Sequence, residues 1–176
     1  MSIFKNKSKM AAPTVEYFNE LCKKNLKTSK KAVTLDIGGG KKISGVSCIA
    51  KYLQRSLDDF KGLSLEDRMA VEQWLEYNNT IQNSSQDAET QKLILKELNT
   101  YLKDKVYFVA QQLTLADILL YHNLHDLIKK LSFQEKEKYI NVSRWFNNVQ
   151  QEKKSRQSLS QLIFLRTPVY DGFSGH

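Results

Sequence analysis

Leu113-Thr114-Leu115-Ala116-Asp117-Ile118, with the apolar run that follows it, is the stretch that decides the fold. Thr114 followed three residues later by Asp117 is typical of a helix start. The hydroxyl can accept a hydrogen bond from the third helical N–H, and the carboxylate can accept one from the N–H of Thr114. Leu113, just before the cap, is expected to pack on Ile118 and so to set the direction in which the helix begins.

The helix predicted after this start is apolar around most of its circumference. Its apolar positions are Ile118, Leu119, Leu120, Tyr121, Leu124, Leu127, Ile128 and Leu131. A helix on the surface of a domain shows a narrower apolar stripe. We therefore expect this helix to be the central, mostly buried helix of an all-helical domain.

Toward the N-terminus the pattern changes from helical to mixed. A helix is predicted from Pro13, followed by a polar connector at Lys27 to Lys31. Ala32 to Ile37 reads as a strand that turns at the glycine triplet 38–40 into a second strand, Lys41 to Ser44. A further helix, Val46 to about Arg55, completes this part.

On the other side of a linker the predictions are all helical. Ser64 and Asp67 form a second cap-like pair and open a helix through Tyr77, after which Asn78 to Gln91 reads as a polar loop. Further helices are predicted from about Ala88 to Leu102, from Ser132 to Tyr139, from Asn141 to Val149, and from Gln157 to Leu165. Pro168 is expected to end the last one.

Composition is ordinary for a globular protein, and charge is unevenly spread. The chain of 176 residues is 41% hydrophobic and 26% charged, contains no apolar run of membrane-spanning length, and carries a net charge of +8. Residues 1–31 hold eight lysines against Glu16 and Glu20. Such an end could contact tRNA through its phosphates, or it could be a solvated terminus. Cys22 and Cys48 form no C-x-x-C pair, so we expect two thiols in a reducing compartment.

The chain resembles glutathione transferases, in which a T-L-A-D-[ILF] box begins the core helix of the C-terminal domain. Within that fold it is similar to the auxiliary proteins of the multi-aminoacyl-tRNA synthetase complex. The resemblance rests on Val71 to Tyr77, Leu98 to Tyr107, Leu113 to Tyr121, Gln134 to Tyr139 and Asn141 to Phe146. It extends from about Val33 to Tyr170 and is poor over the first thirty residues.

The resemblance implies a mainly α, glutathione-transferase-like fold with a shortened N-terminal part. We expect a disordered basic tail at 1–12, a truncated thioredoxin-like α/β domain at 13–56, and a linker at 57–62. An all-helical C-terminal domain at 63–167 and a loose tail at 168–176 would follow. The N-terminal domain is expected to be truncated because a single helix precedes the first clear strand.

Transferase chemistry would need three features that this sequence lacks. A hydroxyl or thiol should follow the first strand, but Tyr17, Cys22 and Ser29 follow no recognisable strand. Val33 stands where the family has a proline, and Gly45-Val46 stand where the family binds the γ-glutamyl carboxylate. We therefore expect no catalytic residue and no cofactor.

Two histidines, His122 and His125, lie one helical turn apart and could both ligate a metal ion. A metal site would need further ligands, and Asp117 is already assigned to the helix cap. A pair of histidines near the interior of a helical domain is more often packed and hydrogen-bonded. We expect the packed arrangement and no metal.

Without chemistry, function is expected to lie on surfaces. The resemblance implies a first face, made by the helix after the strands and by the first helix of the C-terminal domain. Its predicted residues are Ile49, Tyr52, Arg55, Met69, Gln73, Trp74 and Tyr77. Trp74 fits the domain core as well as the interface. A second face is predicted at Asn141, Ser143 and Arg144, because a cation at a helix N-terminus is disfavoured unless it meets a partner.

The resemblance implies a noncatalytic scaffold that docks methionyl-tRNA synthetase on one face and the transferase-like domain of glutamyl-prolyl-tRNA synthetase on the other. Other scaffold proteins of the complex, and a weak tRNA contact, are further expected partners. Two alternatives stay open, namely a glutathione transferase and a basic tRNA-binding adaptor. We expect no membrane contact and a cytoplasmic location with a nuclear pool.

Overall fold

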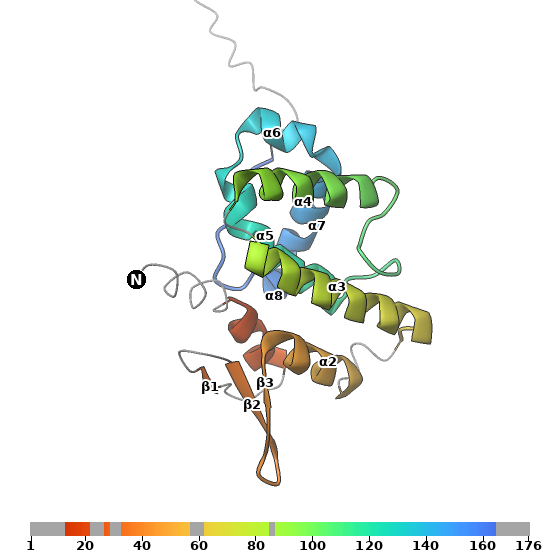
Figure 1. Ribbon diagram of the computed structural model, residues 1–176, viewed down its shortest axis with the longest axis vertical. Coiled ribbons are helices and arrows are strands. Elements are labelled where there is room, and N and C mark those ends of the chain that lie inside the picture. The colour runs from red at the N-terminus through yellow and green to blue at the C-terminus, as the bar shows by residue number, and fades with distance from the viewer. Residues whose placement is uncertain (1–12, 22–26, 29–32, 57–61, 85–86, 165–176) are drawn as a thin grey trace, which may run out of the picture.

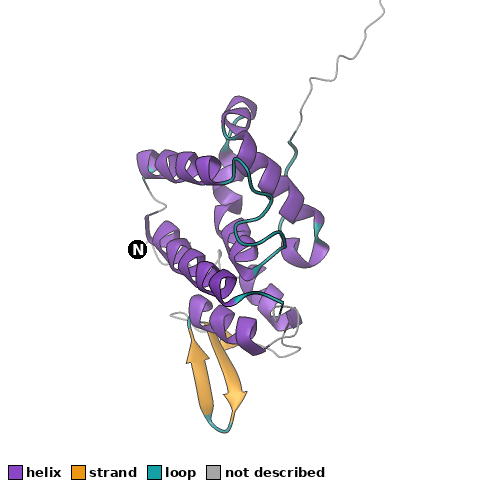
Figure 2. Cartoon of the chain, turned by 90° about the vertical axis from the view of Figure 1, so that its right-hand side faces the viewer, coloured by secondary structure: helices purple, strands orange, loops and turns teal. Residues whose placement is uncertain are grey.

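The computed structural model describes residues 13–21, 27–28, 33–56, 62–84 and 87–164. A helical body makes up most of the molecule, and a small sheet projects from one end of it (Figures 1 and 2). The mainly α expectation is therefore confirmed. The predicted tails 1–12 and 168–176, and nearly all of the predicted linker, lie outside the described residues. No described helix combines the length and the apolar character that a bilayer-spanning segment needs.

The N-terminal part has a helix at residues 13–21 and a three-stranded antiparallel sheet in the order β1-β2-β3. Strand β2 (Val33–Gly38) pairs with β3 (Lys41–Ser44) through a turn whose three glycines all have positive φ, which favours glycine there. The connector prediction was wrong at one point, because β1 (Lys27–Thr28) is a strand paired with β2. Its two residues carry no strand pattern, and the backbone pairing alone makes them a strand.

One face of this sheet is apolar and buried, and the other is polar. Val33 and Leu35 are buried on β2, whereas the alternate position Asp36 is exposed and lies opposite Lys42 of β3. Alternation of this kind places apolar side chains on one face and polar ones on the other. The polar outer face is consistent with an N-terminal part that has fewer elements than a complete thioredoxin-like domain.

Helix α2 (Val46–Ser56) joins the sheet to α3 (Leu65–Ser84). Lys51 Nζ lies 2.9 Å from Glu76 Oε1, and Arg55 Nη2 lies 2.7 Å from Glu72 Oε1. The Lys51–Glu76 hydrogen bond raises the pKa of the lysine and lowers that of the glutamate. Polar contacts between α2 and α3 therefore run along a solvent-exposed edge, where each is worth little by itself.

Helix α5 (Leu115–Lys130) is the centre of the helical body, as predicted. Most of its side chains are buried, and it packs against α3 and α7 (Ile140–Gln151). The other elements of the body are α4 (Ala88–Tyr101), α6 (Phe133–Lys138) and the short α8 (Lys153–Arg156). Because α5 is apolar nearly all round, burial against neighbours on several sides is the arrangement that removes its surface from water.

Asp117, in the first turn of α5, accepts four hydrogen bonds in the interior. Its Oδ2 accepts from Thr114 N at 3.0 Å and from Thr114 Oγ1 at 2.8 Å, which closes the capping box. Its Oδ1 accepts from Phe108 N and from Trp145 Nε1, each at 2.9 Å. One carboxylate therefore joins the start of α5, the loop before it and α7. Leu113 packs against the core beside this cap.

Two predicted segments differ from the structure. The loop predicted at Asn78 to Gln91 is helical as far as Ser84, because Asn78 is buried and accepts hydrogen bonds from Asn123 of α5. The last predicted helix, from Gln157, is wrong for its described residues, since 157–164 contain no helix. Gln157 has a φ of 50°, which ends α8.

The chain after α8 crosses the helical body as an irregular strap, residues 158–164. Leu162 N donates to Gln150 Oε1 at 2.9 Å, and Gln150 Nε2 donates to Leu162 O at 2.8 Å. His125 Nε2 lies 2.8 Å from Ser160 O. Side chains of α5 and α7 therefore satisfy the strap's backbone, which removes the need for a helix there.

Candidate partner interfaces

The two histidines of α5 are buried and hydrogen-bonded, which confirms the packed arrangement. His122 Nε2 lies 2.6 Å from Ser155 O, and its Nδ1 lies 3.0 Å from Thr14 Oγ1. A neutral ring with its proton on Nε2 satisfies both partners, since the ring donates to the carbonyl and accepts from the hydroxyl. Burial lowers the pKa of His122 to about 4. Among the residues that the structure covers, no cluster of three His, Cys, Asp or Glu is placed to hold a metal ion.

The positions that transferase chemistry would use have structural roles here. Val33 is buried and pairs with Thr28 in the sheet. Gly45 N donates to Val33 O at 2.9 Å, and the Ser47 hydroxyl at the start of α2 donates to Asn79 Oδ1 of α3. Tyr17 is buried, and Cys22 and Ser29 lie outside the described residues. Ser47, which follows the predicted γ-glutamyl position in the sequence, thus uses its hydroxyl in the contact between α2 and α3.

Ile49 does not lie on the predicted first face. Its side chain is completely buried, as is that of Ala50, because both point from α2 toward the sheet and the domain core. A residue without exposed surface makes no contact with a partner, so the prediction was wrong for Ile49. Tyr52, one turn later, is half-buried. Arg55 is exposed, but its guanidinium pairs with Glu72.

Trp74 belongs to an aromatic cluster that joins α3 to α4. Its ring centroid lies 4.7 Å from that of Tyr101, 4.5 Å from that of Phe108 and 5.3 Å from that of Tyr77. The hydroxyl of Tyr77 donates to Glu97 of α4 at 2.6 Å. Burial, and then this hydrogen bond, raise the pKa of Tyr77. Trp74 and Tyr77 therefore face α4, on a different side of α3 from the contact with α2.

Three exposed side chains of α3 form a line beside the ion pairs with α2. Leu65, Met69 and Gln73 follow at intervals of four residues, which places them on one side of the helix. Leu65 is 69% exposed and Met69 is 55% exposed. We call this set the α3 stripe. The sequence prediction found Met69 and Gln73 but missed Leu65, although its spacing of four residues from Met69 was the available signal.

The residues predicted for the second face make contacts within the chain. Asn141 N donates to Asn99 Oδ1 at 2.9 Å, and Asn141 Nδ2 donates to Asn99 O at 3.0 Å. Ser143 is buried, and its hydroxyl donates to Lys136 O at 2.7 Å. These bonds fix the start of α7 against α4 and α6. Of the three predicted residues, Arg144 alone has a well-exposed side chain.

Arg144 closes the end of α4. Its Nη2 donates to the carbonyl of Leu102 at 2.7 Å and to that of Lys105 at 3.1 Å, with a longer contact to Lys103. The last carbonyls of a helix have no partner within the helix, so a cation there is favoured. A partner protein is therefore not needed to explain a cation at the N-terminus of α7. The expected reason was wrong, because Arg144 serves the C-terminus of a different helix.

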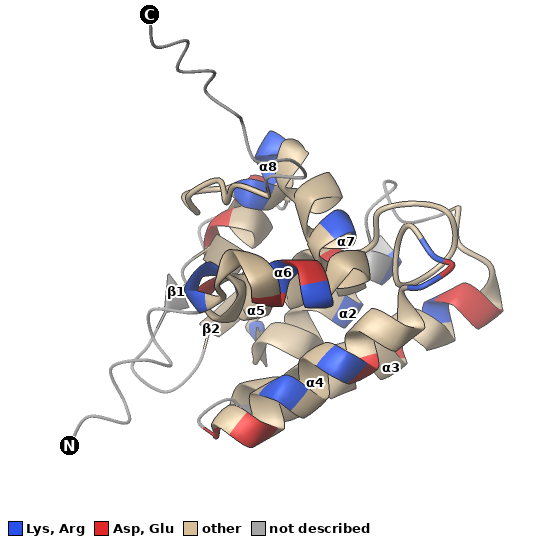
Figure 3. Cartoon of the chain, turned by 90° about the horizontal axis from the view of Figure 1, so that it is seen from above, with Lys and Arg blue, Asp and Glu red and all other residues tan. Residues whose placement is uncertain are grey.

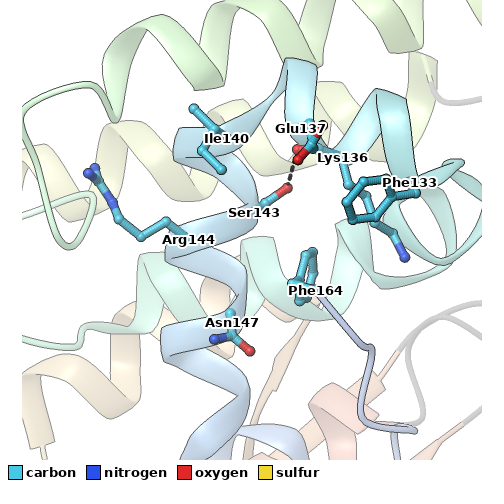
Figure 4. A pocket seen from close by; sticks show the side chains of 8 residues that line it. All are labelled: Phe133, Lys136, Glu137, Ile140, Ser143, Arg144, Asn147 and Phe164. Carbon is cyan, nitrogen blue, oxygen red and sulfur yellow. Dashed lines mark hydrogen bonds between the residues drawn. The ribbon is translucent and has the colours of Figure 1, made fainter. Parts of the chain in front are cut away.

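A groove lies beside Arg144, between α6 and α7 (Figure 4). It encloses about 320 Å³, and we call it the α6–α7 groove. Its lining residues are Phe133, Lys136, Glu137, Ile140, Ser143, Arg144, Asn147 and Phe164. Phe133 is 44% exposed and Ile140 is 48% exposed. Sequence analysis missed both, and it missed Phe164, because no local pattern shows that residues of α6, α7 and the strap meet.

We expect Arg144→Ala to lower the free energy of unfolding by about 1–2 kcal/mol, because the carbonyls at the end of α4 lose a charged donor. Urea denaturation measures this, with Arg55→Ala as control because Arg55 is an exposed, ion-paired arginine on α2. The control should change stability by less than about 0.5 kcal/mol. Equal effects of the two substitutions would contradict the capping role of Arg144.

Charge on the described surface is mixed. Figure 3 shows basic and acidic residues interspersed along α4 and α6. On α4, Lys92 Nζ lies 2.8 Å from Glu89 Oε1. Of the eight lysines in residues 1–31, only Lys27 lies in the described residues. The basic N-terminal segment proposed for tRNA contact therefore lies almost entirely outside them.

Comparison with known sequences identifies relatives associated with translation. The sequence matches the family described as "Nuclear-export cofactor Arc1p" over residues 68–153. Over 138 residues it is 43% identical to "Eukaryotic translation elongation factor 1 epsilon-1" of Mus musculus, covering 77% of this chain and 79% of that one. It is 25% identical over 117 residues to "Glutamate--tRNA ligase, cytoplasmic" of Arabidopsis thaliana, covering 64% of this chain and 16% of the ligase.

Comparison with solved structures identifies the fold. A class Gtt2 glutathione S-transferase of Vibrio parahaemolyticus superposes with a TM-score of 0.61, covering 82% of this chain and 92% of that one, at 19% identity. At this identity the likeness concerns the fold alone. The glutathione-transferase-like fold predicted from the sequence is confirmed.

Proposed function

The chain belongs to the family of eukaryotic translation elongation factor 1 epsilon-1, and from this membership we propose that it is a noncatalytic scaffold of the multi-aminoacyl-tRNA synthetase complex. Its role would be auxiliary, holding aminoacyl-tRNA synthetases together in support of translation. The names of the relatives support this proposal, since they include an elongation factor, the cofactor Arc1p and a tRNA ligase. The family match over residues 68–153 covers most of the helical body, including Met69, Gln73 and the groove lining from Phe133 to Asn147.

The α3 stripe is the observation that carries the proposal. Leu65 and Met69 are large apolar side chains that remain mostly exposed, side by side on one helix. Exposed apolar side chains that lie together are typical of protein–protein interfaces. The ion pairs and the hydrogen bond between α2 and α3 place charged and polar side chains next to the stripe.

The two surfaces suit two different partners. The α3 stripe is on the helix next to α2, whereas α6, which supplies part of the groove lining, lies at the end of the body opposite α2 (Figure 1). We assign one of these surfaces to methionyl-tRNA synthetase and the other to the transferase-like domain of glutamyl-prolyl-tRNA synthetase, with further scaffold proteins joined through these synthetases. The protein would then work in the cytoplasm, with a nuclear pool that cell fractionation would detect.

We expect the double substitution Leu65→Glu, Met69→Glu to weaken capture of one synthetase by at least about tenfold, because two charges replace apolar side chains that a partner would bury. Tagged protein is incubated with cytosolic extract and washed at low salt and at about 0.5 M salt, at which charge pairs are screened and apolar contacts persist. The retained proteins are then identified and quantified.

Leu93→Glu is the matched control, because Leu93 is exposed to a similar degree on α4. It should leave both synthetases bound. Loss of both synthetases from the α3-stripe variant would contradict the two-surface arrangement. Unchanged capture of both would remove the α3 stripe from the proposal.

A glutathione transferase is the second candidate, and the fold alone favours it. Binding of glutathione would appear as retention on glutathione resin that free glutathione reverses. The pairing of Val33 in the sheet and the hydrogen bonds that Gly45 and Ser47 make within the chain argue against glutathione binding. Direct tRNA binding through the basic N-terminus is tested separately. It should fall steeply with salt and vanish when Lys23, Lys24 and Lys27 are replaced.

A further inference from the structure

We propose that the α6–α7 groove is occupied by the chain's own C-terminal segment, residues 165–176, which a partner at this surface would have to displace. The occupancy is a property of this chain alone. The competition with a partner rests on the proposed function. The inference starts from the groove, whose apolar lining residues Phe133 and Ile140 keep nearly half of their surface exposed.

The described chain ends at the groove. The strap is held to the body through Ser160 and Leu162, and its last residue, Phe164, is itself part of the groove lining. The Phe164 ring centroid lies 5.8 Å from that of Phe146, and Lys136 Nζ lies 5.3 Å from its centre. Figure 4 shows the Phe164 ring among the side chains of α6 and α7. The described chain therefore ends at a residue of the groove wall.

A high local concentration favours the chain's own segment over a separate partner. A segment tethered at the groove has an effective local concentration in the millimolar range. An independent partner must therefore bind the groove more tightly than the segment does in order to displace it. Residues 165–173 can span up to roughly 30 Å when extended, at 3.3–3.6 Å per residue. This length is sufficient for an aromatic side chain of the segment to reach the groove, because the segment follows directly after Phe164.

The residue types of the C-terminal segment suit the groove. It carries the large apolar and aromatic residues Leu165, Val169, Tyr170 and Phe173, with Asp171 between the two aromatic ones. The groove offers the exposed apolar surface of Phe133 and Ile140, and its charged lining residues are Lys136, Arg144 and Glu137, two cations against one carboxylate. An aromatic anchor beside a carboxylate fits an apolar groove with basic edges.

Disulfide trapping in the full-length chain tests the occupancy. Cys22 and Cys48 are first replaced by Ala, and cysteines are then introduced as Ile140→Cys and Phe173→Cys. The control pair is Met69→Cys with Phe173→Cys, since Met69 and Ile140 are comparably exposed. In a glutathione buffer at low protein concentration, the disulfide between the cysteines introduced at positions 140 and 173 should form within the monomer at least about tenfold faster than the control disulfide.

Equal rates for the two pairs would overturn the proposal. An Ile140–Phe173 disulfide found only between two chains would also overturn it, since the groove would then receive the segment of a second copy. As an independent readout, the full-length variant Tyr170→Glu, Phe173→Glu should show faster amide hydrogen exchange over residues 133–144. Exchange unchanged from that of the unsubstituted chain would count against occupancy. Neither measurement involves a synthetase, so the scaffold proposal can fail while this one holds.

Discussion

Asp117→Ala should lower the free energy of unfolding by about 4 kcal/mol or more, the largest effect that we expect from a single substitution. Alanine would deprive four buried donors of this acceptor, namely the Thr114 hydroxyl and three N–H groups, those of Phe108 N, Thr114 N and the Trp145 indole. Each buried donor that loses its acceptor costs about 1–3 kcal/mol. A loss of this size is comparable with the whole stability of a typical domain.

The environment of Asp117 explains why this position resists replacement. Burial raises the pKa of the carboxyl, and the hydrogen bonds from Phe108, Trp145 and Thr114 act in the opposite direction. Those hydrogen bonds offset the free-energy cost of removing the carboxylate from water. The same carboxylate caps α5, orders the preceding loop and orients α7, so its removal would loosen three contacts at once.

Urea denaturation followed by circular dichroism measures the effect, and two variants make the test specific. Asp117→Asn keeps one acceptor oxygen and should cost less than alanine, because the amide can still serve two of the donors. Asp126→Ala removes an exposed carboxylate from the same helix and should change stability by less than about 0.5 kcal/mol. An Asp117→Ala chain as stable as Asp126→Ala would show that the four hydrogen bonds contribute nothing.

Stability should fall by about 2–3 kcal/mol between pH 7.5 and pH 4.5 through His122 alone. Burial holds the pKa of this ring at about 4 in the folded chain, against 6.5 for an unperturbed histidine. In this window the unfolded state therefore binds a proton that the folded state does not. The stabilising contribution is present above the unfolded pKa and is lost as the pH falls toward the folded one.

A protonated His122 ring could no longer accept the hydrogen bond from Thr14 Oγ1, and its charge would be buried away from water, which is unfavourable. Other groups also titrate in this range, so the difference between the natural chain and His122→Gln is the quantity to follow. That difference should shrink as the pH is lowered from 7.5 to 4.5, in urea melts at each pH. A difference that stays constant with pH would show that His122 protonates equally well in both states.

Helix starts were predictable from the sequence because their signals are local. At Ser64, Thr114 and Ser132 a hydroxyl residue is followed three residues later by a carboxylate, and all three pairs form the expected hydrogen bonds. The breadth of the apolar surface of α5 likewise predicted its central place. Each of these inferences needs only residues within a turn or two of each other.

The surfaces were less predictable because helical spacing does not say which side of a helix its neighbours cover. Ile49 was assigned to an interface and lies in the core, while Leu65, Phe133 and Ile140 are exposed and were missed. The sequence also could not show that α3 would continue past Asn78, because the partner that holds this residue, Asn123, comes from the distant α5.

By itself, the sequence determined the order of the helices and the places where most of them begin, because capping and periodicity act over three or four residues. Its resemblance to glutathione transferases indicated the fold family. Only the tertiary structure decided what Asp117, Arg144 and Phe164 do. Asp117 meets Trp145, Arg144 meets the end of α4, and Phe164 reaches the α6–α7 groove. Folding brings these groups together across long stretches of chain, and no local pattern records such a meeting.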